Sequence, residues 1–428
     1  MPIQDLPTEL IHQCLQNADY PSLGNAALVC RAWLAPSRDI SWRRISLDFE
    51  GEVPGQLCSI LRNKGTCKPT IPRHVGSLLI DEGYLYDTNQ LTDEDKADIA
   101  RWEDGLMLVL DYFEHIGMLT IGNLNLQRLN PELRGKLLSR NNGGIVFDRL
   151  VVQNLILPDI TEVAPFILDN PHLTFLGLGV IKIDNVGSGE DGENAQIESA
   201  PLSTAVFLPK LRHLVVFADG TGAWSHILPH MHTSPSSLQS LCTLIAVCQQ
   251  PDLLSELIQD VSATLKSLAV GINAPGVRFD ISNCSKLKNL SVNISQYPTQ
   301  EPTLADLMET LSTAPPTLSH LYINCGPSTC TLSAHPPTGA SLWGSLDEHL
   351  CTLKGLNKIA FTQVISSSMA MFMHAGPDAL GGVFGKWKAD LQAFGEEILP
   401  RCKEKRLVGV EQLTGSWTSN PFAGTDLE

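Results

Sequence analysis

One short apolar pattern returns along most of the chain, and it limits the possible folds more than any other feature. In each copy an apolar residue is followed, after two residues, by a second and, after one more, by a third. The second and third members alternate with the period of a strand that is buried on one face. The pattern predicts a series of short strands built on Val75, Leu78, Ile80; Ile116, Leu119, Ile121; Phe147, Leu150, Val152; Leu173, Leu176, Leu178; Leu211, Leu214, Val216; Leu265, Leu268, Val270; Leu287, Leu290, Val292; Leu318, Leu321, Ile323; and Leu356, Ile359, Phe361, with a blurred copy at Leu238 and Leu241.

Segments with helical periodicity lie between these strands, most clearly at residues 93–114, 251–264, 302–314 and 341–354. Strands that alternate with helices predict an α/β fold in which parallel strands carry the helices on one side. Because the unit repeats at short range, the fold is predicted to be a solenoid.

The spacing of the copies indicates that this solenoid is irregular. It ranges from roughly 22 to roughly 41 residues, whereas a regular leucine-rich repeat has ~20–29, and the asparagine expected after each strand is mostly missing. We therefore expect an irregular leucine-rich-repeat-like solenoid over residues 71–413. Helix-forming residues at 386–405 are predicted to cap its far end, because a terminal repeat otherwise exposes its core.

Composition and charge restrict the partners of the chain. With 30 basic and 46 acidic residues, the formal net charge is −16, which disfavours nucleic acid as a partner of the surface as a whole. We find neither a secretory signal nor an apolar run of the ~20 residues that span a membrane. The chain is therefore expected to be intracellular, cytoplasmic or nuclear, with its 11 cysteines reduced.

Two local patterns resemble functional motifs, but neither supports one. The glycine-rich run at 187–192 is more easily explained by a flexible acidic loop over 184–200 than by a dinucleotide site, because its carboxylates would repel a pyrophosphate. The cluster of His226, His230 and His232 lacks neighbouring acidic or cysteine ligands and is interrupted by Pro229. Residues 414–428 are expected to form a disordered tail. We predict no enzyme activity, no cofactor and no metal site.

The first fifty residues form a separate helical unit. Pro7 marks the start of one helix, and Pro21 and Ser22 open a second helix, which Pro36 is expected to end. A third short segment contains Trp42. Three such helices give only a small core, so residues 1–50 are expected to need a partner or an adjoining domain for stability.

Three motifs in this head occur in the order and spacing of the F-box domain. They are Leu-Pro-Thr-Glu-Leu-Ile at 6–11, Leu-Val-Cys-Arg-Ala-Trp at 28–33, and Trp-Arg-Arg at 42–44. Residues 4–47 thus resemble an F-box, which docks on the Skp-family adaptor of cullin–RING ubiquitin ligases. The resemblance implies an adaptor-binding surface that contains Leu6, Pro7, Leu10, Ile11, Leu28 and Val29.

Gly24, Asn25, Ala26 and Ala27 depart from the family pattern, which often has larger apolar or basic residues there. The alternative is a head that merely caps the repeats and uses the six residues of the implied adaptor surface as its own core.

An F-box followed by degenerate repeats resembles the fungal F-box proteins. This similarity implies a substrate-recognition subunit of an SCF-type ubiquitin ligase, bound through the adaptor to a cullin. A protein-interaction scaffold without a ligase role is the alternative. In a horseshoe of repeats, the residues beside the core positions line the concave face. A target protein would then contact Arg149, Phe175, His213, Phe217, Asn289, His320 and Tyr322, unless insertions cover this face.

Overall fold

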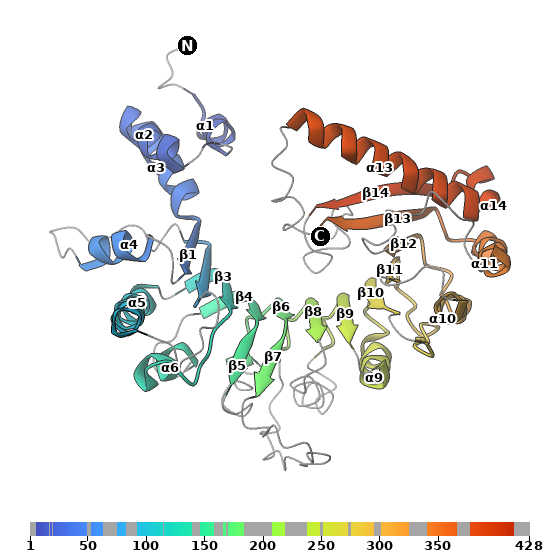
Figure 1. Ribbon diagram of the computed structural model, residues 1–428, viewed down its shortest axis with the longest axis horizontal. Helices are drawn as coiled ribbons and strands as arrows, with labels where there is room; N and C mark the ends of the chain where they lie inside the picture. Colours follow the sequence, from blue (N-terminus) through green and yellow to red (C-terminus); the bar gives the residue numbers. More distant parts are fainter. Residues whose placement is uncertain are drawn as a thin grey trace. The chain divides into compact units, whose positions relative to one another are not determined.

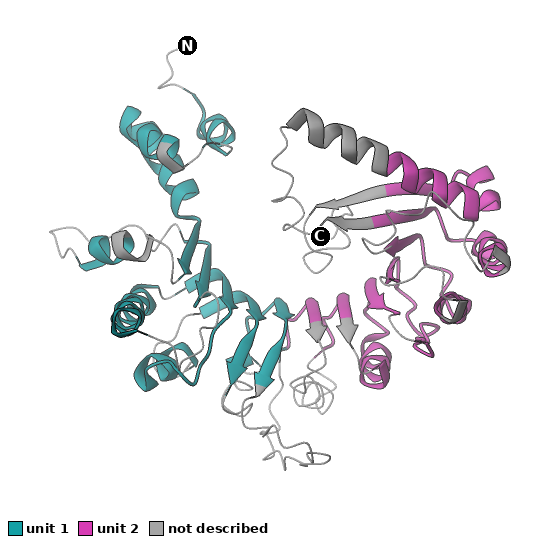
Figure 2. Ribbon diagram, viewed as in Figure 1, with its two compact units in different colours: residues 1–208, 221–227 teal, residues 209–220, 228–428 magenta. Residues whose placement is uncertain are grey.

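The computed structural model divides the chain into two compact units, residues 1–208 with 221–227 and residues 209–220 with 228–428 (Figure 2). Each unit is described by itself. The structure describes residues 6–16, 18, 20–48, 53–62, 75–82, 92–113, 115–138, 146–157, 166–167, 170–183, 208–218, 238–248, 251–272, 275–294, 301–324, 340–365 and 377–414. The predicted loop at 184–200, the tail beyond residue 414 and the three clustered histidines lie outside these residues.

The head consists of three helices, as predicted. They are α1 (Thr8–Leu15), α2 (Tyr20–Val29) and α3 (Arg31–Trp42). The prediction that Pro36 ends the second helix was wrong. Helix α2 ends at Val29 because Cys30 adopts an extended conformation, and Pro36 lies inside α3. Pro36 is buried, so packing of its ring offsets the backbone hydrogen bond that a proline cannot make.

The first unit continues from the head into a parallel sheet. Its strands pair in the order β1-β2-β3-β4-β6, and Figure 1 shows its helices along one side of them. The elements are β1 (Arg44–Asp48), α4 (Val53–Arg62), β2 (Ser77–Asp81), α5 (Asp93–Tyr112), β3 (His115–Gly122), α6 (Pro131–Leu138), β4 (Val146–Gln153) and β6 (Phe175–Leu178), with β5 (Leu155–Leu157) and β7 (Ile181–Ile183) forming a small second sheet.

The second unit repeats this arrangement. Its parallel strands follow the order β8-β9-β10-β11-β12-β13-β14, again with helices on one side (Figure 1). The elements are β8 (His213–Ala218), β9 (Thr243–Cys248), α9 (Pro251–Val261), β10 (Ser267–Gly271), β11 (Asn289–Asn293), α10 (Glu301–Ser312), β12 (His320–Asn324), α11 (Ala340–Thr352), β13 (Lys358–Ile365), α13 (Pro377–Ile398), α14 (Pro400–Glu404) and β14 (Val408–Thr414).

Each sheet has a helix-facing side and an opposite side, which we call the helix-free face. The repeated apolar residues of the sequence pattern point to the helices and are buried, from Leu78 and Ile80 in β2 to Ile359 and Phe361 in β13. The aromatic ring of Phe394 in α13 packs edge-on against Phe361, with 6.0 Å between the ring centroids. The α/β architecture of parallel strands with helices on one side is thus confirmed.

The structure also adds elements that the apolar pattern did not predict. Strand β1 and the helices α4 and α6 belong to the first unit, and strand β14 belongs to the second. The predicted cap at 386–405 is two helices, α13 and α14, because Leu399 leaves the helical conformation before Pro400 starts the next helix. Within the described part of the chain, no helix has both the length and the apolar character needed to cross a bilayer.

Candidate protein-docking surfaces

Helix α2 of the head carries an exposed apolar face. Gly24, Asn25, Leu28 and Val29 follow one another at helical spacing and are all exposed. The side chain of Leu28 is 84% exposed and that of Val29 56%, whereas such residues are normally inside a small domain. Leu10 on α1 is 45% exposed. An apolar face left in water in this way is typical of a protein-interaction site.

The opposite side of α2 explains why these residues stay outside. Leu23 and Ala26 are buried with Ile11 and Leu15 of α1, and Trp33 packs against the same cluster. Once these residues form the core, the helical period turns Leu28 and Val29 to solvent. The chain leaves α2 at Cys30, so both residues sit in its last turn.

The structure separates the six predicted adaptor-binding residues into two groups. Pro7, Leu10, Leu28 and Val29 are exposed. Leu6 is half-buried against the head core, and Ile11 is 1% exposed inside that core. In this conformation Ile11 supports the head from within, and its side chain is not accessible to a partner.

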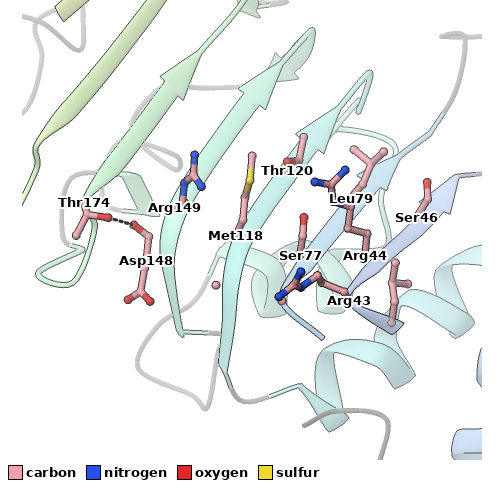
Figure 3. A pocket seen from close by; sticks show the side chains of 13 residues that line it. Arg43, Arg44, Ser46, Ser77, Leu79, Met118, Thr120, Asp148, Arg149 and Thr174 are labelled. Atoms are coloured by element: carbon pink, nitrogen blue, oxygen red, sulfur yellow. Dashed lines mark hydrogen bonds between the residues drawn. The ribbon is translucent and has the colours of Figure 1, made fainter. Parts of the chain in front are cut away.

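A second candidate surface lies on the helix-free face of the first unit. The strand register aligns Arg44, Ser77, Met118, Arg149 and Phe175 in one row across β1, β2, β3, β4 and β6. An adjacent row consists of Ser46, Leu79, Thr120, Val151 and Gly177. Most of these side chains line a groove of about 950 Å³, which Arg43, Asp148 and Thr174 border at the start of the strands (Figure 3).

The groove is locally basic although the whole chain is acidic. Its described lining contains Arg43, Arg44 and Arg149 against a single carboxylate, Asp148. The Arg149 guanidinium carbon lies 4.8 Å from the centre of the Phe175 ring, a cation–π contact that orients both predicted target-binding residues. Asp148 lies 3.8 Å from the His115 ring nitrogen Nε2.

Sequence reasoning missed the arginine pair and Met118 as groove residues. The sequence identifies residues 42–44 only as the basic end of the head motif, because the repeated apolar pattern does not predict β1. The signal that could have revealed β1 is the alternation of Ile45 and Leu47, which are 3% and 1% exposed.

The remaining predicted target-binding residues lie on the same face of the second unit, and two of them are buried. Tyr322 is 1% exposed, and burial raises the pKa of its hydroxyl. Asn289 is also buried and donates a hydrogen bond from Nδ2 to Ser267 Oγ at 3.0 Å. His213 and His320 are half-buried, and burial together with Lys358 lowers the pKa of His320. The side chain of Phe217 lies outside the described ones.

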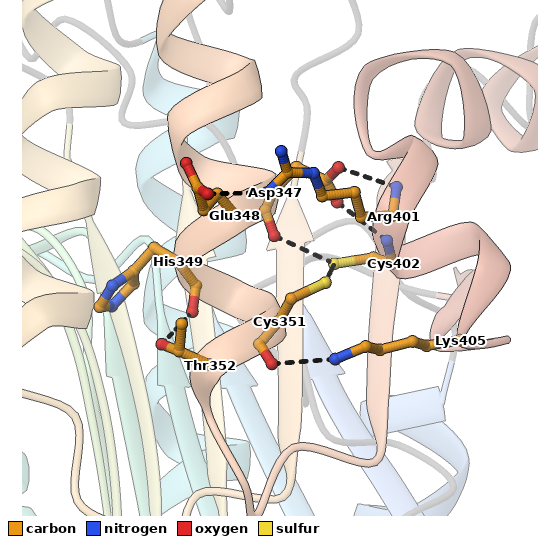
Figure 4. A network of polar contacts seen from close by, with 8 residues as sticks. All are labelled: Asp347, Glu348, His349, Cys351, Thr352, Arg401, Cys402 and Lys405. Atoms are coloured by element: carbon orange, nitrogen blue, oxygen red, sulfur yellow. Dashed lines mark hydrogen bonds and ion pairs between the residues drawn. The ribbon is translucent and has the colours of Figure 1, made fainter.

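Asp347, Cys351 and Cys402 form the described group of potential metal ligands, with one ligand atom of each within 4.8 Å of the others (Figure 4). Both Asp347 carboxylate oxygens already accept backbone N–H groups, from Arg401 at 2.8 Å and Cys402 at 2.9 Å. Burial raises the pKa of the Cys402 thiol far above its ordinary value, whereas metals bind the thiolate. These contacts fasten α14 to α11, so we assign the group a structural role.

Comparison with known proteins agrees with the geometry of the head. No curated protein matches the chain. A protein-family profile described as F-box-like matches residues 3–48, which span α1, α2, α3 and β1. Proteins with this domain are generally substrate adaptors that bind a Skp-family protein and through it a cullin. The N-terminal head of this chain is therefore an F-box-like domain.

Proposed function

We propose that the chain is the substrate-recognition subunit of an SCF-type cullin–RING ubiquitin ligase. The head would bind a Skp-family adaptor, and the helix-free face of the sheet would bind a target protein. The chain would then act by proximity, because holding a target lysine near a charged ubiquitin-conjugating enzyme raises its effective concentration. This role requires no catalytic residue in the chain itself.

The observation that carries the proposal is the exposed apolar face of α2 within a domain that matches the F-box family. Leu28 and Val29 lie next to each other in sequence and both expose most of their side chains. Burying apolar area against a partner yields ~25 cal/mol per Å², so such residues are suited to anchor an interface. The match of residues 3–48 to the F-box-like family supports a Skp-family adaptor as the partner.

The proposal is tested by titrating the purified full-length chain with a recombinant Skp-family adaptor. We expect Leu28→Asp to abolish binding, because a carboxylate would be buried without a partner in the interface. Ile60→Asp is the matched control, since Ile60 is a 40% exposed apolar residue on α4, outside the head.

Two results would contradict the proposal. An adaptor that binds neither the natural chain nor the control would favour the interaction scaffold without a ligase role. Equal binding by the chain with Leu28→Asp would place the adaptor elsewhere than on α2.

A further inference from the structure

The helix-free face of the first unit presents two arginines at a fixed separation. Arg44 on β1 and Arg149 on β4 lie in one cross-strand row, with Ser77 and Met118 between them. Three strand-to-strand steps separate the arginines, and each step is ~4.8 Å, so their Cα atoms lie roughly 14 Å apart. An extended peptide advances ~3.3 Å per residue, so four residues span about the same distance.

Two apolar side chains lie on the groove floor between the arginines, beside Ser77 and Thr120. Leu79 and Met118 are half-buried on the groove floor, so each retains part of its side chain for contact with a ligand. The rim beside Arg43 is formed by Gly76 and Gly117, which have no side chain. A Cβ at Gly117 would lie 2.9 Å from the carbonyl oxygen of Gly76, so there is no room for a side chain at this part of the rim. A peptide backbone can therefore approach the strand ends there.

The charges of the groove select the kind of ligand. Among the described residues, neither Arg43 nor Arg44 forms an ion pair, and the guanidinium of Arg149 lies over an aromatic ring rather than a carboxylate. The whole chain has a net charge of −16, but the three arginines make the charge around this groove positive. A nucleic acid would place many further phosphates against the acidic surroundings, whereas a short peptide need not extend beyond the groove.

We propose that this groove binds an extended acidic segment of the target protein. Two acidic side chains four residues apart would pair with Arg44 and Arg149, and an apolar side chain between them would contact Met118 and Leu79. Guanidinium groups bind carboxylates and phosphates through paired hydrogen bonds, so glutamate, aspartate or phosphoserine could fill either end. This inference rests on the proposed function, because it specifies the target that the receptor would recognise.

The test selects binders from a displayed library of random twelve-residue peptides with the full-length chain. We expect enrichment of an acidic pair four residues apart with an apolar residue between. Selected peptides should lose about 10-fold to 100-fold in affinity with Arg44→Glu or Arg149→Glu, since each change removes a charge-assisted contact. The matched control Arg101→Glu, an exposed arginine of α5, should change affinity less than about 2-fold.

Synthetic versions of the selected peptide distinguish carboxylate from phosphate, by carrying either a glutamate pair or a phosphoserine pair. The inference is overturned if no acidic pair is enriched, if the acidic peptide binds both groove variants normally, or if a single-stranded DNA twelve-mer competes for the groove. Adaptor binding is measured on the same samples. A chain that binds adaptor but shows no acidic preference loses only this inference, whereas a chain that binds no adaptor loses the proposed function.

Discussion

Truncating Leu28 and Ile11 separately distinguishes the proposed adaptor surface from the core that supports it. Leu28 is 84% exposed, so Leu28→Ala should change the stability of the head by less than about 0.5 kcal/mol. If the adaptor buries this side chain, the same change removes ~1–2.5 kcal/mol of binding free energy, which is a loss of roughly 5-fold to 70-fold in affinity.

Ile11 should respond in the opposite way. It is 1% exposed among the residues of the head core, so Ile11→Val should cost ~0.5–1.5 kcal/mol of stability and leave the outer face of α2 unchanged. We therefore expect adaptor affinity within about 2-fold of the natural chain, since a folded head presents the same surface.

Calorimetric titration with the adaptor gives the affinities, and hydrogen exchange of the amides in α1 and α2 gives the local stability of the head. We expect Leu28→Ala to lower adaptor affinity without changing the stability of the head, and Ile11→Val to lower that stability without changing the affinity. Equal losses of affinity from both substitutions would refute the division of the head into a core side and a docking side. Unchanged affinity with Leu28→Ala would refute the assignment of that face to the adaptor.

Three further substitutions test contacts elsewhere in the chain. Asp347→Ala should destabilise the start of α14 by ~1–3 kcal/mol, because two backbone N–H groups lose their acceptor, and faster amide exchange there would show it. The exposed Glu256→Ala on α9 is the control. Burial raises the pKa of Glu82 above its ordinary value, so the folded chain binds the extra proton and loses stability as pH rises from about 4.5 through the raised pKa. Glu82→Gln should reduce this loss, which thermal unfolding at pH 5 and pH 8 would reveal. Gly355→Ala should lower the unfolding temperature, because the new Cβ would overlap the carbonyl oxygen of Pro316, and an unchanged temperature would contradict the close approach.

The repeated strands could be predicted from sequence because each carries its own local signal. Leu287, Leu290 and Val292 are separated by the intervals of the pattern, and all three are fully buried. The path of α3 could not be predicted, because Pro36 opposes a helix locally and is retained there by packing against the rest of the head. Local propensity and tertiary contacts disagree at this point, and the contacts prevail.

The groove could not be predicted for a different reason. Arg44 and Arg149 are more than a hundred residues apart in sequence, and only the register of three intervening strand pairs aligns them. The exposure of target-binding candidates was equally inaccessible from sequence. Arg149 on the helix-free face of the first unit is exposed, whereas Tyr322 on the helix-free face of the second unit is buried.

The junction between the head and the sheet is a single residue, because α3 ends at Trp42 and β1 begins at Arg44. Arg43 caps the helix in helical conformation, and its carbonyl oxygen accepts N–H groups from Gly76 and Ser77. A ligase built on this junction would have almost no tether between adaptor and target, so only target lysines within a narrow radius would meet the ubiquitin donor. Lengthening the junction with a flexible glycine–serine insert should therefore broaden the set of modified lysines, at the expense of effective concentration at each of them.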